Sequence, residues 1–333
     1  MKKIKIVLLY LTLVIVFAGC SKTEPNLTRI NGNVFGTSYH ISYLDFDGID
    51  YEKQVDSLFY LVNKSLSTYS PNSDISKINS GDLLISVDTL FKEVFFKANR
   101  IYKETNGVFD PTIGILVNAW GFGPKPKIEN LDSLKIKKLL NYVGFHKVSL
   151  DGNRVTKQHK EIYFDFNAIA KGFGVDVVGR FFESKGIHDY LIEIGGEVRV
   201  RGKNQNKEYW KIGIEKPNFD GSRSIQKIIS LKNESMATSG NYRKFKIDSI
   251  TGEKYVHTLD TKTGYTAKRD MLSASVISEL DCADVDGYAT ALMAMGFEKS
   301  VRFVENHPEL KIFLIYSGKN GEIKEYSSKN LEF

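Results

Sequence analysis

The segment Cys282–Gly296 (CADVDGYATALMAMG) combines acidic residues with a hydroxyl inside a run of small and apolar side chains. If it forms a helix, Asp286 and Thr290 lie four residues apart and share one face. A carboxylate and a hydroxyl on one face offer the hard oxygen ligands that Mg²⁺ prefers. The alternative is an ordinary helix start, in which Asp284 or Asp286 caps the helix and Thr290 bonds back to a carbonyl. Taken alone, the segment favours the cap.

A second polar segment is D-F-N-A-I-A-K-G at Asp165–Gly172, which we expect to join a strand to a helix. It places Asp165 before the helix start and Lys171 in the first turn. Free backbone N–H groups and the helix dipole at such a start favour an anion such as phosphate. An Asp cap followed by a solvated lysine is the alternative.

Three further turns carry polar residues whose roles stay open. Glu193–Glu197 (EIGGE) places two glycines inside a predicted strand, where a closely approaching ligand or a plain bulge would explain them. Ala237–Tyr242 (ATSGNY) is a hydroxyl-rich turn with or without a further role. In the turn that starts at His257 (HTLDTKTG), His257 and Asp260 could serve acid–base chemistry or could pin the turn.

The segment Gly107–Gly123 (GVFDPTIGILVNAWGFG) is unusually apolar for a loop, because Asp110 is its one charged residue. A loop of this kind must be buried or must line a pocket. It is a plausible wall for an aromatic ring of a ligand.

Several well-known sites are absent from the sequence. It contains no G-x-x-x-x-G-K-[ST], no H-E-x-x-H and no G-x-S-x-G motif. The glycines after Lys171 do not have dinucleotide-binding spacing, and no His/Cys pair has zinc spacing.

The elements that must position these segments alternate irregularly between strands and helices. We expect helices over 51–66, 89–105, 132–140, 168–182 and from 282, with Asp88 capping the second of them. We expect strands over 29–46 (a hairpin), 162–165, 189–201 (broken by Gly195-Gly196), 210–215, 225–231, 242–247, 255–259, 272–278 and 311–316. Without a regular βαβ order, the fold class predicted is α+β with largely antiparallel sheets.

The N-terminus predicts export. Three lysines within the first five residues precede an apolar run from Ile6 to Ala18, which is typical of a signal peptide and short for a membrane span. The sequence F-A-G-C before and including Cys20 resembles a bacterial lipobox, so we expect residues 1–19 to be removed and Cys20 to carry lipid. An ordinary signal peptide with a chance cysteine is the alternative. Residues 20–28 then form a tether, and residues 29–333 form the catalytic domain.

Loss of the leader would lower the formal charge from +6 to +3, which is no argument for nucleic acid binding. Only Cys282 would remain as a free thiol. A disulfide framework is therefore excluded, and the 42% of apolar residues must supply the core.

Taken together, the motifs resemble the ApbE-like FAD:protein FMN transferases from about Arg29 to the C-terminus. The matching motifs are G-T-S-Y at Gly36–Tyr39, S-T-Y-S at Ser67–Ser70, D-I-S-K-I-N at Asp74–Asn79, G-V-F-D-P-T-I-G and W-G-F-G within 107–123, A-I-A-K-G at Ala168–Gly172, E-I-G-G-E, A-T-S-G-N-Y, H-x-x-D-x-x-T-G from His257 and A-D-x-D-G-Y-A-T-A from Ala283. The chain departs from the family in having Phe35 before Gly-Thr and Thr261 after Asp260.

The resemblance implies a T-fold-like α+β architecture and a specific activity. Such enzymes split the FAD pyrophosphate, transfer FMN to a Thr hydroxyl of an acceptor flavoprotein and release AMP. It implies Mg²⁺ at the Ala168 carbonyl, Asp286 and Thr290. The residues implied in FAD binding are Phe35, Tyr69, Val108, Phe109, Asp110, Asp165, Lys171 and Thr258.

Two other functions use the same features: Mg²⁺-dependent hydrolysis of FAD to FMN and AMP, and FAD storage or delivery by a non-catalytic lipoprotein. The Asp286/Thr290 pair disfavours the non-catalytic lipoprotein, because a protein that only binds FAD needs no metal at the pyrophosphate. His257 and Asp260 are the candidates for removing the proton of the acceptor Thr. The resemblance also implies acceptors among respiratory redox-complex subunits, and a lipid anchor facing the periplasmic side.

Overall fold

The computed structural model describes residues 24–82, 84–218, 222, 224–241, 245–247, 254–267 and 270–333. The predicted signal peptide, Cys20 and the first part of the tether lie outside these residues, and so does Tyr242. Within the described part of the chain, no helix is long and apolar enough to cross a membrane.

The centre of the fold is an eight-stranded sheet in which each neighbouring pair is antiparallel. Its strands in spatial order are β1 (Asn26–Val34), β2 (Thr37–Asp45), β5 (Tyr190–Ile194), β6 (Glu197–Arg201), β9 (Ser235–Gly240), β12 (Met271–Ser278), β13 (Lys311–Ser317) and β14 (Ile323–Ser327). The fold is thus α+β with an antiparallel sheet, as the sequence predicts.

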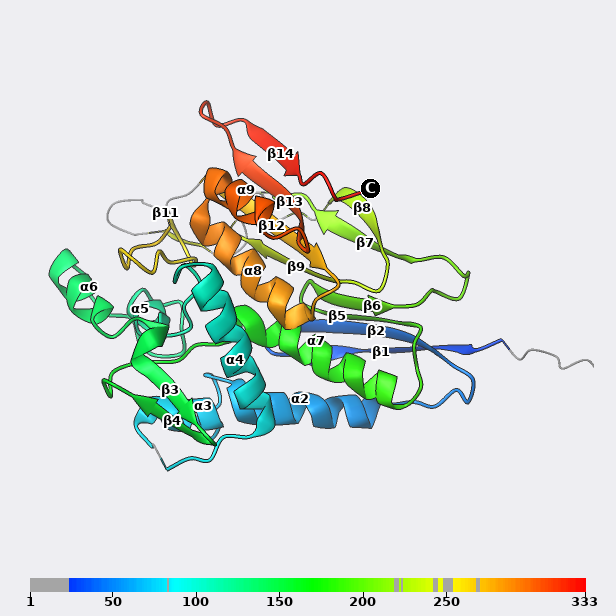
Figure 1. Cartoon of the computed structure of the whole chain (residues 1–333), viewed down its shortest axis with the longest axis horizontal. Coiled ribbons are helices and arrows are strands. Elements are labelled where there is room, and N and C mark those ends of the chain that lie inside the picture. Colours follow the sequence, from blue (N-terminus) through cyan, green and yellow to red (C-terminus); the bar gives the residue numbers. More distant parts are fainter. Residues whose placement is uncertain are drawn as a thin grey trace, which may run out of the picture.

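Helices cover one face of this sheet (Figure 1). α7 (Asn167–Ser184) packs on β5 and β6, α8 (Cys282–Met295) on β9 and β12, and α9 (Phe297–Glu305) on β13. α2 (Glu52–Leu66) and α4 (Thr89–Glu104) form an outer layer against α7 and α8. α7 and α8 are therefore buried between sheet and helices, which explains why both are apolar nearly all round.

The hairpin of β7 (Trp210–Glu215) and β8 (Ile225–Leu231) covers the other face and completes a smaller apolar core. That core contains Val198, Val200, Trp210, Ile214, Ile229, Leu231, Met236, Ile277, Phe313 and Ile315. The remaining elements are α3 (Asp74–Ser80), α5 (Gly114–Ala119), α6 (Ser133–Leu140), a 3₁₀ turn (Phe145–Lys147), β3 (Val148–Asp151), β4 (Arg154–Lys157), β10 (Phe245–Ile247) and β11 (Lys254–Val256).

Local signals predicted many of these elements correctly. Asp88 caps α4, because its carboxylate accepts a hydrogen bond from the Phe91 amide at 2.8 Å. The hairpin at the N-terminus and the helices from residues 52, 133, 167 and 282 also form as expected.

Three expectations were wrong. Residues 162–165 form no strand but make a single bridge from Tyr163 to Ile113. The segment Ala237–Gly240 is not a turn but lies inside β9. Gly195 and Gly196 do not interrupt one strand. They form the two-residue turn of the β5–β6 hairpin, with φ values of 63° and 105° that only glycine adopts readily.

α7 and α8 approach backbone to backbone at Gly172. A Cβ at this position would overlap the carbonyl of Cys282 and would lie 2.8 Å from the Ala283 nitrogen. This glycine is what allows the two helices to contact each other so closely.

We expect Gly172→Ala to lower the free energy of unfolding by about 2 kcal/mol, because two backbones cannot move apart without disturbing the sheet beneath them. Gly287→Ala on α8 is the matched control, since its Cβ would meet the end of the Ile101 side chain at 2.6 Å and the Phe109 ring at an ordinary contact distance of 3.6 Å, with no backbone atom among these neighbours. It should stay within about 1 kcal/mol of wild type. Urea unfolding of both variants measures the difference, and equal losses would contradict the interpretation.

Candidate functional site

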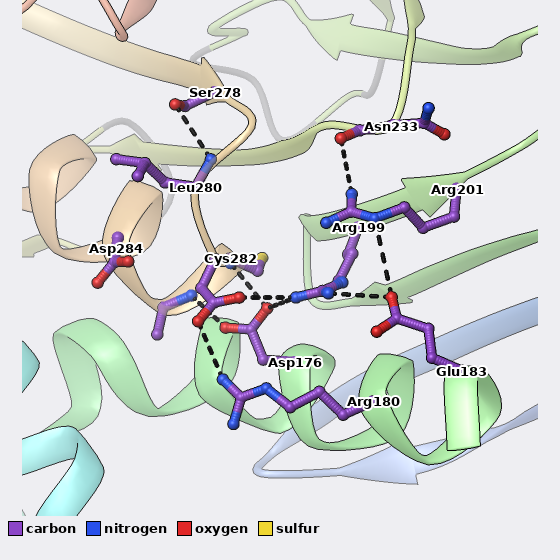
Figure 2. A network of polar contacts seen from close by, with 12 residues as sticks. Asp176, Arg180, Glu183, Arg199, Arg201, Asn233, Ser278, Leu280, Cys282 and Asp284 are labelled. Carbon is purple, nitrogen blue, oxygen red and sulfur yellow. Dashed lines mark hydrogen bonds and ion pairs between the residues drawn. The ribbon is translucent and has the colours of Figure 1, made fainter. Parts of the chain in front are cut away.

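The N-terminus of α8 is capped by a carboxylate from α7. Asp176 accepts hydrogen bonds from the amides of Cys282 and Ala283, each at 2.8 Å. Arg199 on β6 donates to the same carboxylate at 2.7 Å (Figure 2). Burial and the nearby Asp281 raise the pKa of the Asp176 carboxyl to about 6, although Arg199 acts in the opposite direction. The start of α8 is thus fixed by α7 and the sheet together.

Asp284 does not cap the helix, so that expectation was wrong. Its carboxylate points to α4, where Lys97 lies 3.0 Å and Arg100 2.7 Å from its oxygens. Asp281, at the N-cap position, makes no capping hydrogen bond and instead pairs with Lys97, Arg180 and Arg199. Basic side chains of α4, α7 and β6 thus lie within ion-pair distance of the two carboxylates and attract them.

Asp286 faces α7 at the point where that helix begins. Its Oδ2 accepts a hydrogen bond from the Gly172 amide at 3.1 Å. In an α-helix the amide of residue 172 also points to the carbonyl of residue 168. Asp286 therefore lies beside the turn of α7 that begins at Ala168, and the metal assignment of these two residues stays a prediction.

Thr290 lies one turn further along α8, and its hydroxyl is 3.3 Å from the Ser239 hydroxyl on β9. β9 packs against α8 along this stretch. The polar face of α8 thus looks toward the end of β9. Ser239 belongs to the A-T-S-G-N-Y motif, so the strand contributes a hydroxyl beside the predicted metal ligands.

The residues present suit a hard divalent cation. Asp286 is 2% exposed and supplies a buried carboxylate, while Ala168 and Thr290 add a carbonyl and a hydroxyl. No group of three or more His, Cys, Asp or Glu among the described residues could hold a metal by itself. An all-oxygen set with few protein ligands is what Mg²⁺ accepts when substrate phosphates and water complete its shell.

Lys171 pairs with a carboxylate that the sequence analysis did not select. Its Nζ lies 2.5 Å from Oε1 of Glu197, the first residue of β6. Burial would lower the pKa of Lys171, but the charges of Asp286 and Glu197 outweigh it and raise that pKa. Burial also raises the pKa of Glu197 in spite of the lysine. Lys171 thus forms an ion pair with Glu197 and is also influenced by the charge of Asp286. The second glutamate of E-I-G-G-E was the sequence feature that could have indicated this pair.

Asp165 and Tyr69 lie together before α7. The Asp165 carboxylate accepts the Asn167 amide at 2.8 Å, and burial raises its pKa to about 6. Burial and the charge of Asp165 raise the pKa of the Tyr69 phenol, although the residue as a whole is 63% exposed. An exposed aromatic ring beside a carboxylate at a helix start is a suitable place for a base or flavin ring, and the assignment stays a prediction.

The Val108–Asp110 segment is held by its own polar groups. The Asp110 carboxylate accepts from the Thr112 amide and hydroxyl at 2.8 and 2.6 Å and from the Phe145 amide at 3.2 Å. It is 6% exposed, so its visible role is to shape the loop. The Phe109 ring would lie 3.6 Å from a Cβ on Gly287 and joins this loop to α8. Direct contact of Asp110 with FAD stays a prediction.

Phe35 lies at the β1–β2 turn with φ of 51°. Its ring packs edge-on against Phe59 of α2, with centroids 5.6 Å apart, and rests on Gly174 of α7. The ring is thus engaged with the helical layer. Contact of Phe35 with the flavin stays a prediction.

The turn that begins at His257 lies beside both the β9 end and the apolar loop. Thr258 donates to Asn241 at 2.9 Å, two residues beyond Ser239. Thr261 donates to the Gly107 carbonyl at 2.6 Å, and Trp120 donates to the Gly264 carbonyl at 2.9 Å. Thr261, one of the two departures from the family pattern, therefore attaches this turn to the apolar loop.

Asp260 holds that turn together by accepting the amides of Lys262 and Thr263 at 2.9 and 3.1 Å. This supports the turn-forming alternative for Asp260. His257 is half-buried at the start of the turn. The acid–base role of His257 stays a prediction.

The sequence matches the ApbE family over residues 35–314. The chain belongs to the ApbE family. Proteins named FAD:protein FMN transferase from Haemophilus influenzae and Vibrio cholerae are 33% and 35% identical to it, and each comparison covers 98% of this chain and 97% of the relative.

Solved structures of ApbE members have the same fold. The flavin transferase ApbE from Vibrio cholerae superimposes with a TM-score of 0.81 at 33% identity, over 92% of this chain and 98% of that one. The apo flavinyl transferase ApbE from Pseudomonas stutzeri gives 0.79 at 27% identity, over 92% and 96%. The T-fold-like ApbE architecture expected from the motifs is therefore confirmed.

The raised pKa of Asp165 predicts a pH-dependent effect of Asp165→Asn. A carboxyl whose pKa is about 6 when folded and about 3.8 when unfolded stabilises the fold fully below pH 3.8, and the contribution is lost as the pH rises through 6. The asparagine variant should therefore gain about 2–3 kcal/mol relative to wild type between pH 4 and pH 7.5.

Urea unfolding at the two pH values measures this gain, with Asp151→Asn at the exposed end of β3 as the control. A difference between Asp165→Asn and wild type that is the same at both pH values would contradict the burial argument.

Proposed function

We propose that this ApbE family member is an FAD:protein FMN transferase. It would cleave the pyrophosphate of FAD, transfer FMN to a Thr hydroxyl of an acceptor flavoprotein and release AMP. The comparisons support the transferase class and FAD as substrate. The identity of the acceptor residue, the metal and the location are parts of the proposal.

The observation that carries the proposal is the convergence of α7 and α8. The Gly172 amide joins the Ala168 turn of α7 to the Asp286 carboxylate of α8, with the Lys171 ammonium beside them. Phosphoryl transfer requires mainly positioning and charge neutralisation rather than covalent help from the protein. The Lys171 ammonium can neutralise negative charge, and the Asp286 carboxylate can hold a cation beside it. Placed together near the start of α7, these groups are suited to binding a diphosphate.

Each group has a distinct part in the proposed reaction. Asp286, Thr290 and the Ala168 carbonyl would hold Mg²⁺, which when bound neutralises the diphosphate and favours departure of AMP. Lys171, whose ammonium lies on the same turn of α7 as the Gly172 amide, would bind phosphate oxygens. The 107–123 loop and Tyr69 would form the walls against the rings of FAD.

The acceptor step needs one proton to leave. The Thr oxygen would attack the phosphorus of the FMN half while the bond from that phosphorus to the AMP oxygen breaks. The hydroxyl proton would pass to His257 or Asp260, the two acid–base candidates of this turn, of which Asp260 also accepts the amides of Lys262 and Thr263. The attachment of this turn to the apolar loop supports a common site for acceptor and flavin.

The chain would act outside the cytoplasm. The leader and Cys20 support a lipid anchor facing the periplasmic side, and respiratory redox-complex subunits with a target Thr are the proposed acceptors. The domain division at residues 19 and 28 belongs to the same proposal.

The test is to incubate the protein with FAD, Mg²⁺ and a candidate acceptor domain. A fluorescent acceptor band on a denaturing gel together with AMP would support transfer. AMP without a labelled band for any acceptor would favour FAD hydrolysis, and neither product with FAD still bound would leave a binding protein.

We expect Asp286→Asn to lower the rate of AMP release about a thousandfold, since loss of metal binding removes about 4 kcal/mol of charge stabilisation. Asp284→Asn is the matched control on the same helix, because its carboxylate pairs with α4 rather than facing α7. It should change the rate far less at a temperature where both variants are folded. AMP quantified by chromatography measures both, and an unaffected Asp286→Asn would remove the metal assignment.

A further inference from the structure

Glu197 is a buried carboxylate for which the proposed reaction has no use. It is 2% exposed and opens β6 directly after the Gly195-Gly196 turn. Its Oε1 pairs with Lys171 at 2.5 Å. Its Oε2 is buried without a hydrogen-bond partner in the described part of the chain. A half-satisfied buried carboxylate is costly, so its presence calls for a physical reason.

The Gly195-Gly196 turn that precedes Glu197 is held by contacts on both sides. Glu193, on the other side of the turn, accepts the Gly196 amide at 2.6 Å. A Cβ on Gly195 would lie 2.7 Å from the Thr37 side chain, so the turn is pressed against β2. A carboxylate that follows such a turn at the start of a central strand has little freedom to move.

Lys171 has two carboxylates within reach of its charge. Among the described residues its ion-pair partner is Glu197, while Asp286 acts on it through space. A lysine side chain is long and flexible, and its ammonium is a compact charge that competes with metal cations for the same oxygens. Lys171 is half-buried, and Asp286 contacts the amide of the next residue, Gly172. Without Glu197, the ammonium would be attracted to the Asp286 carboxylate.

We propose that Glu197 is a positioning residue that holds the Lys171 ammonium away from Asp286 and so keeps the Asp286 carboxylate open to the divalent cation. This inference rests on the metal site of the proposed function. Glu197 acts through Lys171 and contacts neither the metal nor the reacting phosphorus. Oε1 alone holds the ammonium.

The test is a double-mutant cycle with Mn²⁺ as the probe. Binding is measured by the loss of the free Mn²⁺ electron paramagnetic resonance signal, with the full chain and without nucleotide, so that phosphate binding by Lys171 does not enter the result. Glu197→Gln should weaken Mn²⁺ binding about tenfold, because Lys171 then pairs with Asp286. Glu193→Gln, the acid on the other side of the same turn, is the matched control and should leave Mn²⁺ affinity unchanged.

Lys171→Met supplies the decisive comparison. In the wild-type background it should change Mn²⁺ affinity less than about threefold, whereas in the Glu197→Gln background it should restore most of the lost affinity. Equal effects of Lys171→Met in both backgrounds would show that the charges act independently, and would overturn the proposal. A variant that merely unfolds the site could not be rescued by a second substitution.

A structure of Glu197→Gln gives a second readout. We expect Lys171 Nζ in contact with the Asp286 carboxylate, and a lysine that stays in place would contradict the inference. Wild-type protein that binds no Mn²⁺ would instead contradict the metal site of the proposed function. Mn²⁺ binding to wild type with additive variants would contradict the role of Glu197 alone.

Discussion

The carboxylate of Asp176 connects α7, α8 and the sheet, whose relative positions determine whether the site forms. It closes the start of α8 by accepting two backbone amides, and it holds Arg199 of β6 on its other side. Arg199 also reaches Asp281 and Glu183, so sheet, α7 and α8 share one buried set of charges (Figure 2). Removing one partner of such a set leaves an uncompensated buried charge, which typically costs about 3–5 kcal/mol.

This arrangement separates the structural charges of α8 from those available for chemistry. The first turn of the helix is occupied by ion pairs to α4 and α7 through Asp281 and Asp284. Two residues after Asp284, Asp286 has no ion pair within 4 Å among the described residues, although the charge of Lys171 acts on it, and its carboxylate faces α7 at Gly172. Gly172 then lets the two helices approach closely enough for that carboxylate to reach the α7 amide. The position of the oxygen ligands is therefore set by packing and by charges that lie outside the site.

Local physics made several features predictable from the sequence. The Asp88 cap, the amphipathic α2 and α4 and the shared face of Asp286 and Thr290 depend on residues less than two turns apart. Features decided by distant residues were missed. Asp284 was predicted as the cap of α8 because the residue that does cap it, Asp176, lies more than a hundred residues earlier in the sequence. The role of Glu197 depends on its ion pair with Lys171, which lies on another element. The Gly195-Gly196 turn could be recognised only from the register of β5 and β6. The motifs identified the family even where their geometry could not be derived.

The strand order has a consequence for how the chain reaches its folded state. β2 pairs with β5, bringing Tyr39 opposite Ile194, and β6 pairs with β9 across the β7–β8 insertion. Most of the sheet is thus closed by contacts between residues far apart in the chain, and such topologies fold slowly because loop-closure entropy is lost before contacts compensate for it. Until β9 and β12 are in place, α8 has no surface to cover, and its nearly all-apolar sequence remains open to solvent. The helix that carries the candidate metal ligands is for that reason the segment most in need of protection from self-association while the chain is still folding.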